Sequence, residues 1–178
     1  MFSALTMPKS TPLLKPLLPI LVLFFSGLQS CKISLSGISI PETARTVSVE
    51  NIENQAALTN PAFPQQFTED LRQRFLSQTR LQVINANGDL GFSGSITQYQ
   101  TQSLALTGNE TSALTRLSIS IKVKFDNQLN PEKNFEKTFT RFADFEANQP
   151  LSAVESTLLQ ELSEQLVQDI FNEAFLDW

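Results

Sequence analysis

The sequence contains no histidine and only one cysteine, and these two scarcities exclude whole classes of chemistry. Without histidine the chain cannot form a Ser-His-Asp triad, a Cys-His pair or a His-ligated zinc site. It also has no GxGxxG motif and no P-loop. Its closely spaced carboxylates, such as Glu69 with Asp70 and Glu161 with Glu164, fall on stretches that we expect to be solvated helix. We therefore expect a protein that is not an enzyme and has no catalytic residue and no metal site.

The N-terminal segment has the composition of a secretory signal. Residues 1–15 carry two cations and no acid, and residues 16–25 are uncharged and almost wholly apolar. This apolar run is too short to cross a bilayer, which takes about 20 residues. The segment over residues 1–30 is therefore predicted to be a signal peptide that is removed.

The single cysteine follows this segment directly, in the sequence Leu28-Gln29-Ser30-Cys31. An aliphatic residue, a variable position, a small residue and then cysteine resemble the bacterial lipobox, although Gln29 departs from its usual pattern. In proteins with this motif the thiol receives a diacylglyceryl group, and the amine freed by cleavage is acylated. We expect this covalent N-acyl and S-diacylglycerol lipid on Cys31, and no other cofactor. The alternative is an ordinary signal peptide followed by a free or buried thiol.

Positive charge is scarce in the part that remains after cleavage. Residues 31–178 number 148 and carry 11 Lys and Arg against 18 Asp and Glu, a net charge of −7. Nucleic-acid binding needs a basic surface, so we expect no nucleic acid as a partner. The length suits one domain over residues 43–178, preceded by a lipidated tether over residues 31–42. With 14 Phe against one Trp and one Tyr, the core is expected to be built from phenylalanine and aliphatic side chains.

Alternation of apolar and polar residues predicts several strands in this domain. The clearest is 115–125, where alternate residues are apolar and Lys122 and Lys124 lie on the opposite, polar face. Asn87-Gly88 is typical of a hairpin turn between the strands on either side of it. The other expected strands cover residues 43–50, 81–84 and 89–100.

The segment 134–145 is ambiguous, because its phenylalanines suit a helix and also a strand. Pairing with the strand before it favours a strand. If Phe125 lies opposite Phe135, then Ile121 lies opposite Phe139, and a lysine lies opposite a glutamate. We therefore predict an antiparallel strand in this register.

Two amphipathic helices complete the domain. The first is expected from near Pro64 to about Gln78, with a buried stripe and Leu76 beside it. The second is long and begins at Ser152 in a capping box with Glu155. Two helices covering one face of a mostly antiparallel sheet of about four to five strands define a two-layer α+β sandwich. The expected stripes are Phe67, Leu71 and Phe75 in the first helix, and Val154, Leu158, Leu162, Leu166 and Ile170 in the second.

The order of these segments resembles that of the LptE family of lipopolysaccharide-assembly lipoproteins. The resemblance rests on the lipobox, the NPAFPQQFTEDLRQRF helix, the GDLGFSGSI and LSISIKVKF strands and the long acidic C-terminal helix. It implies a non-enzymatic outer-membrane lipoprotein that assists assembly of the LptD β-barrel and plugs it during lipopolysaccharide transport and insertion. It also implies possible contact with lipopolysaccharide.

Two questions stay open at this point. Lys122 and Lys124 are candidates for lipopolysaccharide contact, and the alternative is that they form an ordinary solvated strand face. The protein could instead be a subunit of another envelope transport or secretion machine, or a lipoprotein that binds a small apolar ligand. No acidic residue lies close after Cys31, so we expect the periplasmic face of the outer membrane as its location.

Overall fold

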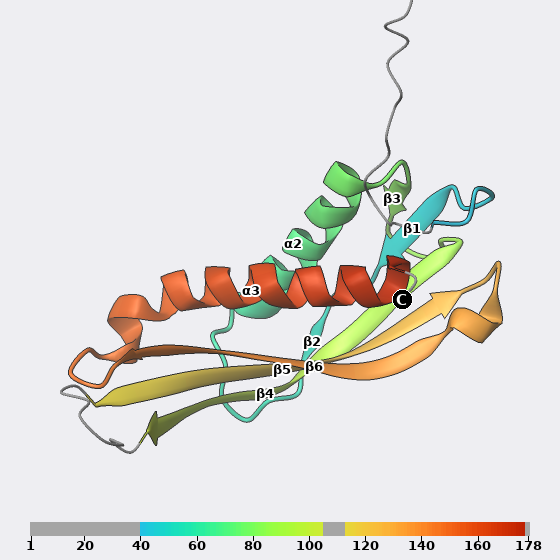
Figure 1. Ribbon diagram of the computed structural model, residues 1–178. Helices are drawn as coiled ribbons and strands as arrows, with labels where there is room; N and C mark the ends of the chain where they lie inside the picture. Colours follow the sequence, from blue (N-terminus) through green and yellow to red (C-terminus); the bar gives the residue numbers. More distant parts are fainter. Residues whose placement is uncertain (1–39, 105–112, 177–178) are drawn as a thin grey trace, which may run out of the picture. The chain divides into compact units, whose positions relative to one another are not determined.

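Figure 1 shows the computed structural model, which describes residues 40–104 and 113–176. The expected signal peptide, Cys31 and most of the expected tether lie outside the described residues. All described elements belong to the unit Gly37–Trp178. In chain order they are β1 (Thr46–Val49), β2 (Glu53–Asn54), α2 (Phe63–Gln78), β3 (Gln82–Ile84), β4 (Leu90–Leu104), β5 (Leu114–Asn127), the 3-10 turn η1 (Pro131–Lys133), β6 (Phe135–Glu146) and α3 (Leu151–Phe175).

The described strands form one sheet in the order β3-β1-β4-β5-β6, with β2 paired to β4. The long ladders β4–β5 and β5–β6 are antiparallel, whereas the short pairings of β1 and β2 are parallel. The predicted α+β class is confirmed. The sheet has six strands among the described residues, slightly more than expected, because two-residue β2 is too short to show an alternating pattern.

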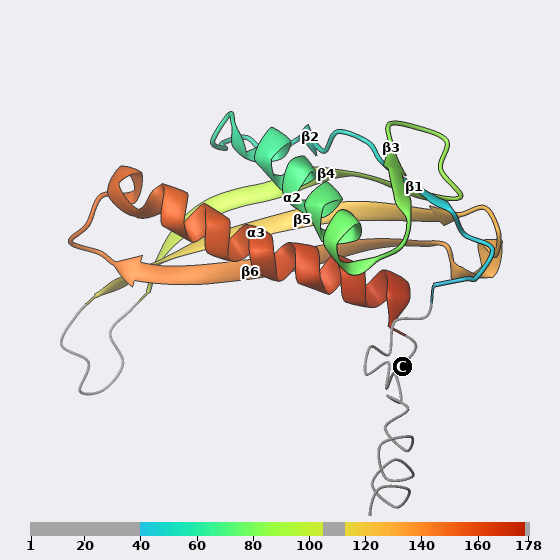
Figure 2. The same cartoon turned by 90° about the horizontal axis from the view of Figure 1, so that it is seen from above.

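Both helices lie on the same face of the sheet (Figures 1 and 2). Helix α3 packs on β5 and β6, and α2 packs on β1 and β3 and against α3. The core between the layers is mainly aromatic. Its largest fully buried side chains are Phe63, Phe67, Phe75, Phe92, Phe125, Phe171, Phe175, Leu71, Leu90, Ile96, Leu117 and Ile119.

A local hydrogen bond and Pro64 both favour the first turn of helix α2. The Asn60 side chain accepts a hydrogen bond from the Ala62 amide, and Pro64 stands in the first turn, where its missing N–H costs nothing. The predicted stripe is fully buried. Leu76, which was expected beside the stripe, is 53% exposed. It lies about 100° around the helix from Phe75, and that rotation turns it to solvent.

The ambiguous segment is strand β6, as predicted, and its register is also confirmed. Phe125 lies opposite Phe135, Ile121 opposite Phe139 and Lys124 opposite Glu136. The rings of Phe125 and Phe135 are 5.3 Å apart. Cross-strand pairing therefore decided between two periodicities that the segment alone left undecided.

The hairpin expected at Asn87-Gly88 is wrong. Strand β1 lies between β3 and β4 and pairs parallel with both, so the connection from β3 to β4 crosses from one side of β1 to the other. Asn87 has a φ of 57°, and a Cβ on Gly88 would lie 2.6 Å from the backbone nitrogen of Ser48. These two residues suit the conformation of the connection, but the sequence pattern did not show that a third strand would insert.

The predicted capping box of α3 is also wrong. The helix begins one residue earlier, at Leu151, after Pro150, and no side chain caps it. The Glu155 carboxylate instead accepts hydrogen bonds from the Tyr99 hydroxyl and the Asn60 amide. Tertiary partners thus take the carboxylate that a capping box would use. The expected apolar stripe of α3 is buried from Leu158 onward.

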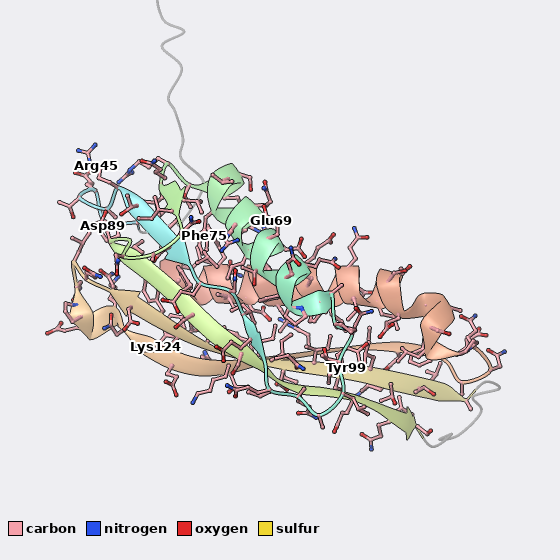
Figure 3. The ribbon with its side chains drawn as sticks, turned by 180° about the vertical axis from the view of Figure 1, so that it is seen from behind. Arg45, Glu69, Phe75, Asp89, Tyr99 and Lys124 are labelled. Carbon is pink, nitrogen blue, oxygen red and sulfur yellow. The ribbon has the colours of Figure 1, made fainter. Side chains whose placement is uncertain are left out.

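Asp89 fastens the start of β4 to the start of β1, and Figure 3 labels it near Arg45. Its Oδ2 accepts hydrogen bonds from the amides of Arg45 at 2.9 Å and Thr46 at 3.0 Å, and from the Thr46 hydroxyl at 3.0 Å. These backbone N–H groups favour the charged carboxylate, so they lower the pKa of Asp89 below its usual value. The ionised carboxylate is therefore the form that stabilises this parallel pairing.

The first prediction concerns the acid sensitivity of this contact. Because the folded-state pKa of Asp89 is depressed, its stabilisation is complete above the unfolded value of about 3.9 and is lost as pH falls through the folded pKa. Asp89→Asn should therefore lower the free energy of unfolding at neutral pH, and the gap to wild type should narrow towards about pH 3. Urea unfolding across this range measures the gap. A gap that stays constant with pH would show that the charge is not what matters.

The second prediction concerns the helix stripe. Leu162 is fully buried, whereas Glu164 on the same helix is exposed. Leu162→Ala should cost roughly 2–5 kcal/mol of unfolding free energy, because it leaves a cavity between the layers. Glu164→Ala is the matched control and should cost little. Equal losses in urea unfolding would mean that the stripe does not form the core.

Candidate functional site

The candidate site is the outer face of the sheet, meaning the side of β4, β5 and β6 that the helices do not cover. Along β5, buried apolar residues alternate with Arg116, Ser118, Ser120, Lys122 and Lys124 on this face. Figure 3 labels Lys124 on the side of the sheet away from α2. The Ser120 hydroxyl bonds Thr140 on β6 at 2.8 Å and Gln98 on β4 at 3.2 Å, so polar contacts cross all three strands.

The two lysines singled out in the sequence lie together on this face, and each has an acidic partner. Lys122 forms an ion pair with Glu136 on β6, and the Nζ of Lys124 lies 2.7 Å from Asp126. The hydrogen bond that Lys124 donates to the Asp126 carboxylate raises the pKa of Lys124 above its usual value. The two side chains are 50% and 54% exposed, so these ion pairs are strongly solvated. Such exposed pairs contribute only about 0–1 kcal/mol, which means that another anion can compete for either lysine at small cost.

A cleft of about 320 Å³ lies beside these lysines. Gly94 on β4 contributes to it, and a Cβ there would lie 2.3 Å from the carbonyl oxygen of Lys122. Glycine is therefore required for the close approach of β4 to β5 at this point. The remaining lining residues are Glu50, Asn51, Glu53, Gln55, Ser93, Ser95, Lys122, Lys124 and Glu136.

Sequence reasoning missed the acidic residues of this cleft. Glu50 and Glu53 line it because β2 pairs with β4 next to Ser95. No local pattern marks them, since β2 has only two residues and its partner lies about 40 positions further along the chain. The cleft thus holds lysines and carboxylates together, a mixed arrangement that can engage both cationic and anionic groups.

The outer face also carries an aromatic group near its other end. Phe142 on β6 is 50% exposed, and the guanidinium of Arg116 lies 3.6 Å from its ring centroid. The Nε and Nη2 of that guanidinium each donate a hydrogen bond to the Asp144 carboxylate at 2.8 Å. This hydrogen-bonded pair lowers the pKa of Asp144 and raises that of Arg116. Phe142 is therefore flanked by a fixed ion pair rather than covered by other apolar groups.

A second cluster that the sequence did not predict joins β4 to the start of α3. The Tyr99 hydroxyl donates to Glu155, and partial burial together with this carboxylate raises the pKa of Tyr99 above its usual value. A cleft of about 250 Å³ beside it is lined by Leu58, Leu151 and neighbouring polar residues. The cluster anchors the N-terminal part of α3 to β4 through Tyr99 and Glu155.

Three further expectations concern Cys31, metals and membrane spans. Cys31 lies outside the described residues, so its lipidation stays a prediction. Within residues 40–104 and 113–176, no group of three or more Asp, Glu or Cys is placed to hold a metal ion. In the same part of the chain, the helices are too short or too polar to span a bilayer.

These features define a class of protein: a small two-layer α+β domain that leaves one polar, ion-paired sheet face uncovered. Within that class, the family model described as "LptE: Lipopolysaccharide-assembly" matches residues 44–174. The chain therefore belongs to the LptE family, and its functional class is lipopolysaccharide assembly. The match begins just before β1 and ends within the last turn of α3.

Comparison with solved structures supports the fold. A putative neuraminyllactose-binding hemagglutinin homolog from Helicobacter pylori aligns with a TM-score of 0.50 at 9% identity, over 78% of this chain and 87% of that one. A minor lipoprotein from Acinetobacter baumannii aligns at 0.45 and 14% identity, over 70% and 91%. The rare lipoprotein B from Shewanella oneidensis aligns at 0.44 and 10% identity, over 70% and 89%. The likeness to the Helicobacter pylori structure concerns the fold alone. No curated protein sequence matches the chain.

Proposed function

We propose that this protein is an outer-membrane lipoprotein that assists assembly of an LptD-like β-barrel and plugs it during lipopolysaccharide transport and insertion. The observation that carries this proposal is the family match, which spans nearly the whole described domain. The proposal involves no reaction. The domain acts by occupying space and by binding.

The distribution of polar and apolar residues supports a plug. A domain inside a water-filled barrel must be polar on the surfaces that meet the lumen, while its own core keeps it rigid. Here most of the described phenylalanines are buried between the two layers, and the uncovered sheet face, apart from Phe142, carries serines, threonines and ion pairs. An outer face of this composition can contact a polar lumen wall without requiring a second hydrophobic surface.

The anchor in this proposal is lipid on Cys31. One acyl chain holds a protein to a membrane only marginally, whereas two or three hold it stably. Fourteen residues separate Cys31 from the first residue of β1, Thr46. Fully extended, they reach at most about 50 Å, enough for the domain to enter a barrel from the periplasmic side while its lipid stays in the bilayer. The absence of acidic residues close after the cysteine supports the periplasmic face of the outer membrane.

The third prediction tests the partner. Tagged full-length protein, extracted from membranes in mild detergent, should co-purify with one large β-barrel protein, identified by mass spectrometry. Cys31→Ala is the companion variant: it should remain uncleaved or become soluble, and it should not fractionate with the outer membrane when the barrel is absent, because its lipid tether is gone. Capture of envelope components without a β-barrel would favour another transport or secretion machine and overturn the proposed role.

The fourth prediction tests whether Lys122 and Lys124 contact lipopolysaccharide. Replacing both with glutamine should weaken binding of purified lipopolysaccharide, and the difference from wild type should be largest at low salt, where exposed charges are least screened. The matched control is the double variant Lys137→Gln and Arg141→Gln. It removes the same charge from exposed ion pairs on the helix side of the same sheet. Equal binding by the two double variants would make the lysines an ordinary solvated face.

A further inference from the structure

Strand β6 forms a long open edge of the sheet. It is the last strand in the sheet order, and within the described residues it pairs only with β5. Of its 12 residues, only Phe139 and Ala143 are buried. The opposite edge, β3, has only three residues. A long exposed edge can pair with a strand of another chain, and proteins usually block such edges.

The backbone groups that face the open side can be assigned from the ladder. The Ala147 amide donates to the Ala113 carbonyl, which continues the β5–β6 register by one pair. Pairs in this register exchange hydrogen bonds at every second residue, so the odd-numbered residues of β6 bond β5. The even-numbered residues, including Thr140 and Phe142, therefore direct their N–H and C=O groups away from the sheet.

The two basic side chains that could block this edge are bound elsewhere. Lys137 donates to Glu173 on α3 at 2.7 Å, and Arg141 makes two bonds of 2.6 Å to Asp169 on α3. Both side chains are thus attached to the helix rather than free to lie across the edge. Phe142 remains half exposed on the outer face of this strand.

A second copy of the chain fits this edge in one register. A twofold axis perpendicular to the sheet makes the two β6 strands antiparallel and keeps like faces together, so the axis must pass through a residue position. Four such registers pair at least nine residues, with the axis at residue 139, 140, 141 or 142. The first three place like charges directly opposite each other, which is destabilising. With the axis at residue 139, Lys137 lies opposite Arg141. With the axis at residue 140, Glu136 lies opposite Asp144. With the axis at residue 141, Arg141 lies opposite its own counterpart and Glu136 lies opposite Glu146.

The register centred on Phe142 has no like-charge pair. It places Phe142 opposite its own counterpart and Phe139 opposite Phe145, giving aromatic pairs on both faces of the joined sheet. The remaining opposed pairs are Thr140 with Asp144, Thr138 with Glu146 and Arg141 with Ala143.

We propose that two copies of this protein join edge to edge through β6, antiparallel and centred on Phe142, to form one continuous sheet. The pairing gives partners to the open backbone groups of β6 and covers Phe142 in the same contact. This inference goes beyond the proposed function, because a barrel plug needs no second copy. Its test measures cross-linking between copies and the mass of the protein in solution. Neither measurement depends on whether the protein captures a barrel.

The fifth prediction is tested by single cysteines in the full chain, purified in detergent and oxidised mildly. Phe142→Cys should give a covalent dimer, because an opposed hydrogen-bonded pair has Cα atoms about 5.5 Å apart, within disulfide range. Thr140→Cys and Thr138→Cys are the matched controls. In this register each lies about 14 Å and about 27 Å from its own counterpart, beyond that range. The parent chain, whose only cysteine is Cys31, sets the background.

A dimer at Thr138 or Thr140 but not at Phe142 would overturn the register. Yields at all three positions that do not exceed the parent would overturn the interface.

Light scattering of the uncrosslinked protein gives a second readout. Phe142→Lys places two lysines opposite each other at the axis and should weaken dimerisation about tenfold or more. Leu76→Lys makes a similar change at a comparably exposed position on α2 and should leave the dimer intact. A monomeric wild type, or equal dimerisation of the two variants, would contradict the proposal.

Discussion

The ring of Phe92 on β4 lies 4.8 Å from that of Phe75 on α2 and 4.8 Å from that of Phe125 on β5. Phe175 on α3 contacts the same group edge-on, 5.8 Å from Phe75 and 6.3 Å from Phe125. These contacts connect residues from 75 to 175 and join both helices to the two central strands. Aromatic pairs of this kind contribute about 0.5–1.5 kcal/mol each beyond the area that they bury. The two-layer arrangement depends on this cluster, because it joins α2, α3, β4 and β5 in one set of contacts beside the buried aliphatic stripes of the helices.

All large aromatics of the long strands except Phe142 lie on the inner side of the sheet, and this has a consequence for the outer side. Apart from Phe142, the outer face is left with serines, threonines and charged residues, which bond to one another across the strands rather than to a covering layer. Its ion pairs are exposed and weak, so the face can exchange partners at little cost in stability. A rigid core therefore supports an adaptable surface, which suits a domain whose proposed work is binding.

The same one-sided packing leaves the end of the sheet open. Helix α3 binds β6 from the inner face through Phe139, Lys137 and Arg141, but its position does not place any described element beside the strand. An open edge and an uncovered face meet at Phe142. Both result from covering a long antiparallel sheet with only two helices on one side.

Local sequence patterns determined the elements of this protein. Apolar residues recur at every second position on β5 and at every third or fourth position on α2 and α3. This spacing specifies which side of each element is buried, because the direction of a side chain follows from the backbone geometry. The β5–β6 register was also predicted correctly, since it pairs Phe125 with Phe135, Ile121 with Phe139 and a lysine with a glutamate. The two candidate lysines could be placed on a common polar face for the same reason.

The tertiary structure decided which strands pair and which side chains bond to one another. Asn87-Gly88 is typical of a hairpin turn, but only the folded chain shows that β1 inserts beside it, because a four-residue strand pairs through backbone groups that any sequence possesses. Glu155 has the spacing of a capping residue, yet Tyr99 and Asn60 bind it from distant positions. Glu50 and Glu53 reach the lysine cleft through a parallel pairing of two residues. Long-range contacts of this kind leave no periodic trace in the chain, so they appear only once the layers are packed.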